Sequence, residues 1–335
     1  MSLHRQLGAF NPDYGYHFVP GLKARVEHHG GGYLVKVNEA GFRSNNEFVA
    51  EKPPGTFRAL LFGDSFTAGD GVSNGARYSE VLEELVPGLQ VYNFGVPGTG
   101  PDEHLLIYRN AARGIDHDLV IIGVWVENIR RVMMRYRPGL KSTTGELLWM
   151  PKAYFTLGPD GELVRGNDPV PRDQVPTEEL DEEDRAGMMK VTGLRATRHI
   201  PQSVRKVIQR TTKYDTLPEY QSPDSPGWRL LSAILRTWTA ESSVPVIVMP
   251  IPTSRHLDET TSAEHYQARY AELADPPRVT ISDPLPKLLE YPVEERLTFR
   301  FSQDDDHPTK RYHRVLAELL APAVTEVREA TAQHA

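Results

Sequence analysis

Five short apolar runs, separated by stretches of helical periodicity, restrict the fold of this chain more than any other feature of its sequence. Several of the runs carry apolar residues at consecutive positions instead of at every second one, which is typical of strands in a parallel sheet covered on both faces. The pattern therefore predicts a central parallel sheet of about five strands. The runs span residues 57–62, 89–94, 119–126, 244–249 and 279–281.

The segments between the runs predict the helices of the same fold. Apolar residues recur at helical spacing over residues 78–85, 101–113 and 226–240. A further helix is expected to open at Pro308, because proline is favoured at the first helical position. Strands that alternate with helices in this way predict a doubly wound α/β sheet.

Two segments interrupt this alternation. Residues 1–56 are expected to form an N-terminal β-hairpin extension, whose turn is the sequence His28-His29-Gly30-Gly31-Gly32. Residues 131–225 are rich in proline, glycine and charge, and we interpret them as an insertion, a possible lid, with a second hairpin over residues 153–164. The core domain would then be discontinuous and comprise residues 57–130 and 226–328.

The composition excludes several classes of protein. The 335 residues include no cysteine, which excludes a disulfide scaffold, a thiolate zinc site and a cysteine nucleophile. A net charge of -7 without a dense basic block argues against nucleic-acid binding. The longest apolar run is far shorter than the roughly 20 residues that span a membrane. Because the first residues lack the apolar core of a signal peptide, we expect a cytoplasmic protein or a trimmed, mature secreted chain.

A serine and a histidine stand where open α/β sheets hold their ligands. Ser65 follows Gly63 at the carboxyl end of the first predicted strand. His307 precedes the last predicted helix and is itself preceded by Asp304 and Asp305. A carboxylate at that spacing can accept the imidazole Nδ1–H, which leaves Nε2 to take a proton from a serine hydroxyl. The two segments together predict nucleophilic catalysis of acyl transfer.

With these motifs the sequence resembles the SGNH (GDSL-type) hydrolase superfamily. The motif after the third predicted strand, Val126-Glu127-Asn128-Ile129, departs from the family pattern Gly-x-Asn-Asp, since it keeps only the asparagine, Asn128. The resemblance covers roughly residues 57–130 and 228–325 and implies a three-layer α/β/α, flavodoxin-like fold. The four blocks, in order, read Gly63-Asp64-Ser65, Asn93-Phe94-Gly95-Val96-Pro97-Gly98, Val126-Glu127-Asn128-Ile129 and Asp304-Asp305-Asp306-His307-Pro308.

The resemblance also implies a division of labour among the matched residues. Ser65 would be the nucleophile, and His307 its general base and then the acid for the leaving alcohol. The orienting carboxylate would usually be Asp304, three positions before the histidine. Because some relatives use the residue two positions before it, Asp305 is the alternative.

An oxyanion hole completes the implied site. It would consist of the backbone N–H groups of Ser65 and Gly98 and the side-chain amide of Asn128. Trp125 and Arg130 stand close to the predicted mouth and are candidates for the substrate pocket. No cofactor is expected and no metal, because the paired histidines of the hairpin turn have no further ligand at a metal-binding spacing in the sequence.

The implied activity is that of a serine-dependent esterase that cleaves an O-acyl ester of a carbohydrate or small metabolite through an acyl-enzyme on Ser65. An O-acyltransferase would use the same residues, with an alcohol in place of water to resolve the intermediate. A third interpretation is a non-catalytic binding module that kept the fold. The expected partner is the small-molecule or carbohydrate ester itself, and no oligomeric state is indicated.

Overall fold

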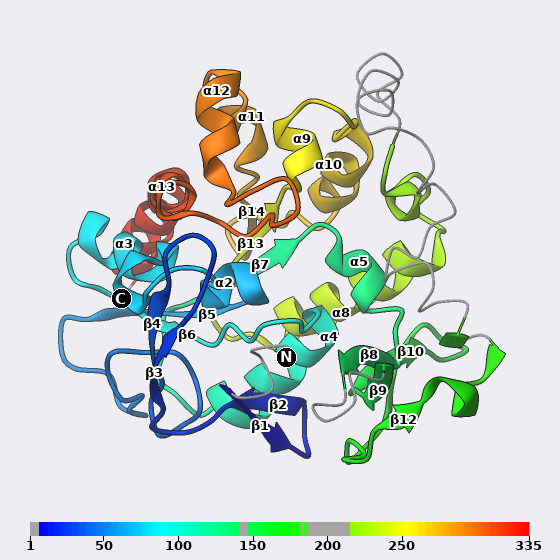
Figure 1. Ribbon diagram of the computed structural model, residues 1–335. Coiled ribbons are helices and arrows are strands. Elements are labelled where there is room, and N and C mark those ends of the chain that lie inside the picture. The colour runs from blue at the N-terminus through cyan, green and yellow to red at the C-terminus, as the bar shows by residue number, and fades with distance from the viewer. Residues whose placement is uncertain (1–6, 141–146, 183, 186–214, 335) are drawn as a thin grey trace.

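A five-stranded parallel sheet forms the centre of the computed structural model, which describes residues 7–140, 147–182, 184–185 and 215–334 (Figure 1). The strands are β5 (Phe57–Phe62), β6 (Leu89–Asn93), β7 (Leu119–Trp125), β13 (Val246–Ile251) and β14 (Val279–Ile281). They lie in the order β6–β5–β7–β13–β14, which is the flavodoxin-like order 2-1-3-4-5. The predicted fold class and the five predicted strands are confirmed.

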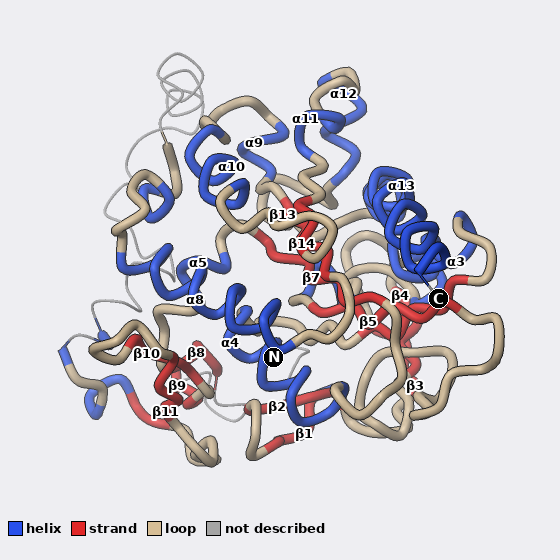
Figure 2. Tube along the Cα trace, turned by 180° about the vertical axis from the view of Figure 1, so that it is seen from behind, coloured by secondary structure: helices blue, strands red, loops and turns tan. Residues whose placement is uncertain are grey.

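Helices cover both faces of the sheet, so the apolar runs are shielded from water on both sides (Figures 1 and 2). Every residue of β5 and of β13 is buried, which explains why their apolar positions are consecutive. On one face α3 packs against α13, and on the other α4 packs against α8. These helices are α3 (Tyr78–Leu85), α4 (Pro101–Ile107), α8 (Pro226–Glu241) and α13 (Lys310–His334).

Two predicted helices differ in detail. The stretch 101–113 is α-helical only as far as Ile107 and continues as a π-helical turn, η2 (Tyr108–Ala112). The last helix begins at Lys310, because Pro308 forms an antiparallel bridge with Arg300 instead of opening the helix. The bridge closes the loop of residues 301–307 at its base, and this loop carries His307.

Short helices fill the connections of the core. The turn η1 (Asn74–Ala76) follows α2, and η4 (Pro218–Tyr220) leads into α8. The other short helices are α2 (Ser65–Ala68), α5 (Asn128–Arg131), α9 (Ser254–Leu257), α10 (Glu264–Ala271), α11 (Leu285–Leu288), α12 (Val293–Arg296), η3 (Thr177–Glu179) and η5 (Leu297–Phe299).

The N-terminal extension contains two hairpins where the sequence predicted one. β1 (Gly8–Asn11) pairs with β2 (Gly15–Phe18), and β3 (Lys23–Val26) pairs with β4 (Tyr33–Lys36). The second hairpin is the predicted one, with its turn at the histidine and glycine run. Its inward residues share a hydrophobic cluster with Ala68, the last residue of α2. The extension is therefore packed onto the core.

The insertion is made of antiparallel strands. Its predicted hairpin corresponds to β10 (Tyr154–Leu157) and β11 (Leu163–Gly166). Residues 141–146, 183 and 186–214 lie outside the described part of the chain, so a lid within 131–225 stays a prediction. Among the described residues, no helix has the length and apolar character needed to cross a membrane. The remaining strands are β8 (Tyr136–Leu140), β9 (Leu147–Pro151) and β12 (Val175–Pro176), which form one sheet.

One buried arginine joins the extension to the helix that follows β5. The Arg43 guanidinium donates to the carbonyl oxygens of Ala68, Gly69 and Val72, each at 2.8 Å, and to Asn74 Oδ1. Carbonyls at the C-terminal end of a helix have no partner within the helix. The Arg43 guanidinium donates hydrogen bonds to these buried carbonyl oxygens, and a buried carbonyl without a donor would cost free energy.

Replacement of Arg43 should therefore destabilise the whole domain. We expect Arg43→Met to lower the free energy of unfolding by about 3 kcal/mol or more, because several buried carbonyls lose their donor. Urea denaturation followed by circular dichroism measures this. The matched control is Arg25→Met on the exposed side of β3, where a change within about 0.5 kcal/mol is expected. Equal stability of the two variants would contradict the role assigned to Arg43.

Candidate active site

The first block turns the chain sharply from strand β5 into the short helix α2. Ser65 is the first residue of this helix and is 5% exposed. Asp64 caps the helix, since its Oδ1 accepts the backbone N–H of Phe66 at 3.0 Å. The serine thus stands at the carboxyl end of a central strand, where α/β sheets hold their ligands.

Ser65 and His307, which are 242 positions apart, lie within hydrogen-bond distance of each other. The Oγ of Ser65 is 3.0 Å from Nε2 of His307, and Nδ1 of His307 is 2.7 Å from Oδ1 of Asp305. The backbone N–H of His307 also donates to the same Asp305 oxygen, at 3.2 Å. An imidazole held in this way carries its proton on Nδ1 and presents Nε2 as the acceptor for the serine hydroxyl.

The carboxylate in contact with His307 is Asp305 and not the favoured candidate Asp304. The backbone N–H of Asp304 donates to Ser302 Oγ, and this local turn leaves Asp304 exposed. Asp306 accepts a hydrogen bond from Ser254 Oγ at 2.8 Å. The expectation for Asp304 is thus corrected at the level of geometry: only the middle aspartate of the run faces the histidine.

The charges around His307 favour its protonated form. Burial alone would lower the pKa of His307, yet the hydrogen bond to Asp305 and the negative charges of Asp70, Asp305 and Asp64 raise it above its ordinary value of 6.5. For Asp305, burial works to raise the pKa, and the hydrogen bonds from His307 and His29 outweigh it and hold the pKa below the ordinary value. The pair therefore suits a histidine that gains a proton while the aspartate stays ionised.

Asp64 connects the first block with the third. Its Oδ2 accepts the side-chain amide of Asn128 at 3.2 Å and a guanidinium N–H of Arg131 at 2.8 Å. Arg131 also donates to the backbone carbonyl of Thr99 at 3.0 Å, in the loop after β6. Asn128 is fully buried. The contacts of one carboxylate thus bring together the loops that follow β5, β6 and β7.

The loop after β6 approaches α2 closely. A Cβ added to Gly95 would lie 2.5 Å from the backbone nitrogen of Ala68, so only glycine fits there. Gly98 has φ +74°, in the left-handed region that glycine adopts without strain. The implied oxyanion donors Ser65, Gly98 and Asn128 thus sit on three neighbouring loops. Their joint action on an oxyanion stays a prediction.

The two candidate pocket residues differ in their surroundings. Trp125 stacks on Phe66, with ring centroids 5.2 Å apart, and Phe66 lies 5.7 Å from the ring of His307. Trp125 therefore belongs to an apolar wall beside the serine. Arg130 instead pairs with Glu219 at 2.8 Å and donates to the carbonyl of Thr216. Because these partners already bind its guanidinium, the structure does not support Arg130 as a substrate ligand.

A cavity of about 520 Å³ opens beside the histidine. Its walls include His28 and His29 from the tip of the β3–β4 hairpin, Asp70, Ser302 and His307. Sequence reasoning missed the hairpin tip as part of this site, because no local spacing connects residue 28 with residue 305. The residues of the tip contact Asp305 directly: Nε2 of His28 and of His29 lie 3.0 and 2.7 Å from its Oδ2.

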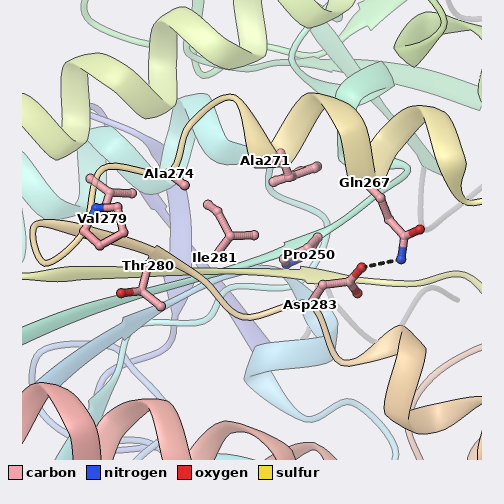
Figure 3. A pocket seen from close by; sticks show the side chains of 10 residues that line it. Pro250, Gln267, Ala271, Ala274, Val279, Thr280, Ile281 and Asp283 are labelled. Carbon is pink, nitrogen blue, oxygen red and sulfur yellow. Dashed lines mark hydrogen bonds between the residues drawn. The ribbon is translucent and has the colours of Figure 1, made fainter.

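A second cavity, of about 390 Å³, lies between α10 and β14, and Ser65, Asp305 and His307 are not among its lining residues (Figure 3). Its lining is mainly apolar, with Ala271, Ile281 and Val279 among the residues drawn. Its polar lining residues include Gln267, Thr280 and Asp283, and Asp283 accepts a hydrogen bond from the side-chain amide of Gln267 at 2.7 Å. His307 and Asp305 line the first cavity, and Ser65 Oγ lies 3.0 Å from His307 Nε2, so the candidate active site is there.

Comparison with known proteins finds similarity among solved structures. No family profile and no curated protein matches the sequence. The similar structures include a member of the lipolytic protein G-D-S-L family from Veillonella parvula, with 14% identity and a TM-score of 0.41 over 81% of this chain and 99% of that one. A carbohydrate acetylesterase family member from Sinorhizobium meliloti has 13% identity and a TM-score of 0.34 over 81% and 99%.

A two-domain esterase active on acetylated mannans is also similar, with 10% identity and a TM-score of 0.39 over 82% of this chain and 50% of that one. At such low identities the activities of those proteins cannot be assigned to this chain, so its activity has to be inferred from its own residues.

The three aspartates before His307 allow a direct test of the triad. Asp305→Asn should slow the labelling of Ser65 by a fluorophosphonate roughly 10³- to 10⁴-fold, because the amide no longer stabilises the imidazolium. Asp304→Asn removes an equal charge from an exposed position and should stay within about threefold of the wild type, since solvent screens it. The rate is followed by intact-protein mass spectrometry. The reverse order of the two effects would restore Asp304 as the triad acid.

The raised pKa of His307 predicts the pH dependence of the same labelling reaction. A protonated His307 cannot accept the serine proton, so the rate should rise with pH through an apparent pKa above 6.5. In Asp70→Asn this apparent pKa should fall, because one of the negative charges that favour the imidazolium is gone. An unchanged or higher apparent pKa in the variant would show that Asp70 does not act on the histidine.

Proposed function

We propose that this chain is a serine ester hydrolase of the SGNH type, which cleaves an O-acyl ester through an acyl-enzyme on Ser65. One observation carries the proposal. The hydroxyl of Ser65, the imidazole of His307 and the carboxylate of Asp305 form a continuous hydrogen-bonded chain, with heavy-atom distances of 3.0 and 2.7 Å. This arrangement is the one that makes a serine nucleophilic.

In the first half of the reaction the serine is acylated. Nε2 of His307 takes the hydroxyl proton as Ser65 Oγ attacks the carbonyl carbon of the ester. Asp305 stabilises the imidazolium that forms and remains ionised, in keeping with its lowered pKa. When the tetrahedral intermediate collapses, the C–O bond to the alcohol breaks. The alcohol oxygen takes the proton from His307, and the acyl group stays on Ser65.

In the second half water removes the acyl group. His307 accepts a proton from the attacking water, and the oxygen of that water bonds to the acyl carbon. Collapse of the second intermediate returns the proton from His307 to Ser65 Oγ and releases the carboxylic acid. An alcohol in place of water would give transfer instead of hydrolysis by the same steps.

The developing oxyanion would be stabilised by the N–H groups of Ser65 and Gly98 and the amide of Asn128. The position of Ser65 supports this proposal, since the first N–H groups of a helix have no partner within it. The contact of Asn128 with Asp64 is consistent as well, because a side-chain amide has two N–H donors and Asp64 takes one of them.

The surroundings of Ser65 support an alcohol with several hydroxyl groups and a small acyl group. The cavity beside His307 is lined by imidazoles and carboxylates, which bind hydroxyl groups well. The wall formed by Phe66 and Trp125 on the other hand is apolar and suits the acyl chain. We therefore propose a short O-acyl ester of a carbohydrate or a polar metabolite as the substrate.

Hydrolysis of p-nitrophenyl acetate tests the proposal. The wild type should release p-nitrophenol, and Ser65→Ala should reduce kcat by about 10⁴-fold or more, since the nucleophile is gone. The same assay with and without an acceptor sugar separates a hydrolase from an acyltransferase, because turnover that requires the acceptor indicates transfer. Acetylated xylan tests a carbohydrate ester as the substrate. Unchanged hydrolysis by Ser65→Ala would contradict both enzymes, and a serine inert toward esters and fluorophosphonates would favour a binding module.

The oxyanion assignment predicts a separate effect. Asn128→Ala should lower kcat for the same ester by about 10²- to 10³-fold with little change in KM, because the donor acts mainly in the transition state. Asn110→Ala on the exposed surface of η2 is the matched control and should leave kcat unchanged. Thermal unfolding of both variants checks that the fold is kept. A wild-type kcat in a folded Asn128→Ala would remove Asn128 from the oxyanion hole.

A further inference from the structure

The outer edge of the Asp305 carboxylate is held by two histidines from the N-terminal extension, far from the motifs that resemble a known family. We propose that His28 and His29 are positioning residues for the triad: they donate to Asp305, fix its orientation and set the proton affinity of His307. This inference rests on the proposed function, since it assigns Asp305 to the triad.

Both oxygens of the Asp305 carboxylate accept hydrogen bonds. Oδ1 accepts Nδ1–H of His307 at 2.7 Å and its backbone N–H at 3.2 Å. Oδ2 accepts Nε2–H of His28 at 3.0 Å and of His29 at 2.7 Å. A carboxylate offers about four lone-pair sites, so these four donors saturate it. Rotation of the carboxyl group would break at least two hydrogen bonds, which fixes the edge that faces His307.

The tautomer of His28 is determined by its neighbour in the turn. The backbone N–H of Gly30 donates to Nδ1 of His28 at 3.0 Å. In the neutral ring the proton is therefore on Nε2, where it points to Asp305.

His28, His29 and Asp305 also place three potential ligand atoms within 4.8 Å of one another. A metal on Nε2 would require the proton on Nδ1, against the Gly30 N–H, so the geometry favours hydrogen bonds over a metal site.

The hairpin tip is fixed against the loop of residues 301–307 by Phe301, the first residue of that loop. Its ring packs edge-on against His28, with centroids 4.5 Å apart, and the rings of His28 and His29 stack at 4.3 Å. A Cβ at Gly30 would lie 2.5 Å from the Phe301 ring, and one at Gly71 would lie 2.4 Å from it. Phe301 is thus enclosed between the hairpin turn and the loop after α2, which keeps the two histidines at their distance from Asp305.

The hydrogen bonds from His28 and His29 should also lower the pKa of His307, because they weaken the stabilisation of its imidazolium by Asp305. Hydrogen bonds to Oδ2 spread the carboxylate charge, so the imidazolium of His307 gains less from its partner. Other groups act on the same centre: the negative charges of Asp64 and Asp70 favour protonation of His307, and His307 in turn lies close enough to affect His313 on α13. Removal of the histidine pair should therefore raise the pKa of His307.

The test uses the full chain with His28→Leu/His29→Leu and with His28→Gln/His29→Gln. In the leucine variant we expect kcat/KM for p-nitrophenyl acetate to fall about ten- to a hundredfold, by analogy with the loss of a group that orients a metal ligand. The midpoint of the acidic limb should also move to higher pH. Glutamine keeps an N–H donor and should restore part of both effects. Leu34→Gln, on the exposed face of β4, is the control for changes in the hairpin.

The same pH series with fluorophosphonate labelling separates the two proposals. If the wild type hydrolyses no ester but Ser65 is labelled, the proposed function fails, and the labelling rates still measure the effect of the pair on His307. A leucine variant with wild-type rate and midpoint would overturn the inference, as would a loss of rate with no shift of midpoint. Inhibition of the wild type by Zn²⁺, reversed by EDTA and absent in the leucine variant, would assign the pair to a metal instead.

Discussion

The buried carboxylate of Asp64 is the interaction on which the geometry of the candidate site depends. It caps the helix that carries Ser65, accepts the amide of Asn128 and pairs with Arg131, which in turn holds the carbonyl of Thr99. Loss of one partner of a buried ion pair leaves an uncompensated charge and costs about 3–5 kcal/mol. Because the contacts reach the loops after three neighbouring strands, the positions of the proposed nucleophile and of the proposed oxyanion donors are set together.

A second constraint on the site comes from the contacts of the N-terminal extension with the loop of His307 and with α2. The loop of His307 is closed at its base by the bridge between Arg300 and Pro308, and the N-terminal hairpin touches it from the other side. Arg43 joins the same extension to the carbonyl end of the helix that begins with Ser65. The extension is thus bound to both halves of the serine–histidine pair, although it lies outside the segments that resemble the hydrolase superfamily.

Most of the fold could be predicted from the sequence, because buried parallel strands require consecutive apolar residues and these are visible in 57–62 and 119–126. Local patterns failed where the contacts of the loop of residues 301–307 decide the structure. Pro308 was expected to open the last helix, but its bridge with Arg300 delays the helix to Lys310. The preference for Asp304 followed the usual family spacing, while the turn around Ser302 presents Asp305 to the histidine.

The same limit applies to the residues that the sequence could not place in the site. Nothing near His28 and His29 in the sequence indicates a partner 277 and 276 positions away, respectively. Arg130 was a candidate for binding substrate, but a cation near a predicted mouth cannot be distinguished from one that pairs with Glu219. The division of roles around the oxyanion stays a prediction, since it concerns a species that forms only during the reaction.

Direct detection of the acyl-enzyme tests the central claim most closely. The protein is mixed with p-nitrophenyl acetate, quenched in acid within the first turnover, digested and mapped by mass spectrometry. The account predicts one acetyl group on the peptide that contains Ser65, which appears with the first equivalent of p-nitrophenol and disappears as hydrolysis completes. Turnover without acetyl on Ser65, or with the label on another residue, would contradict it.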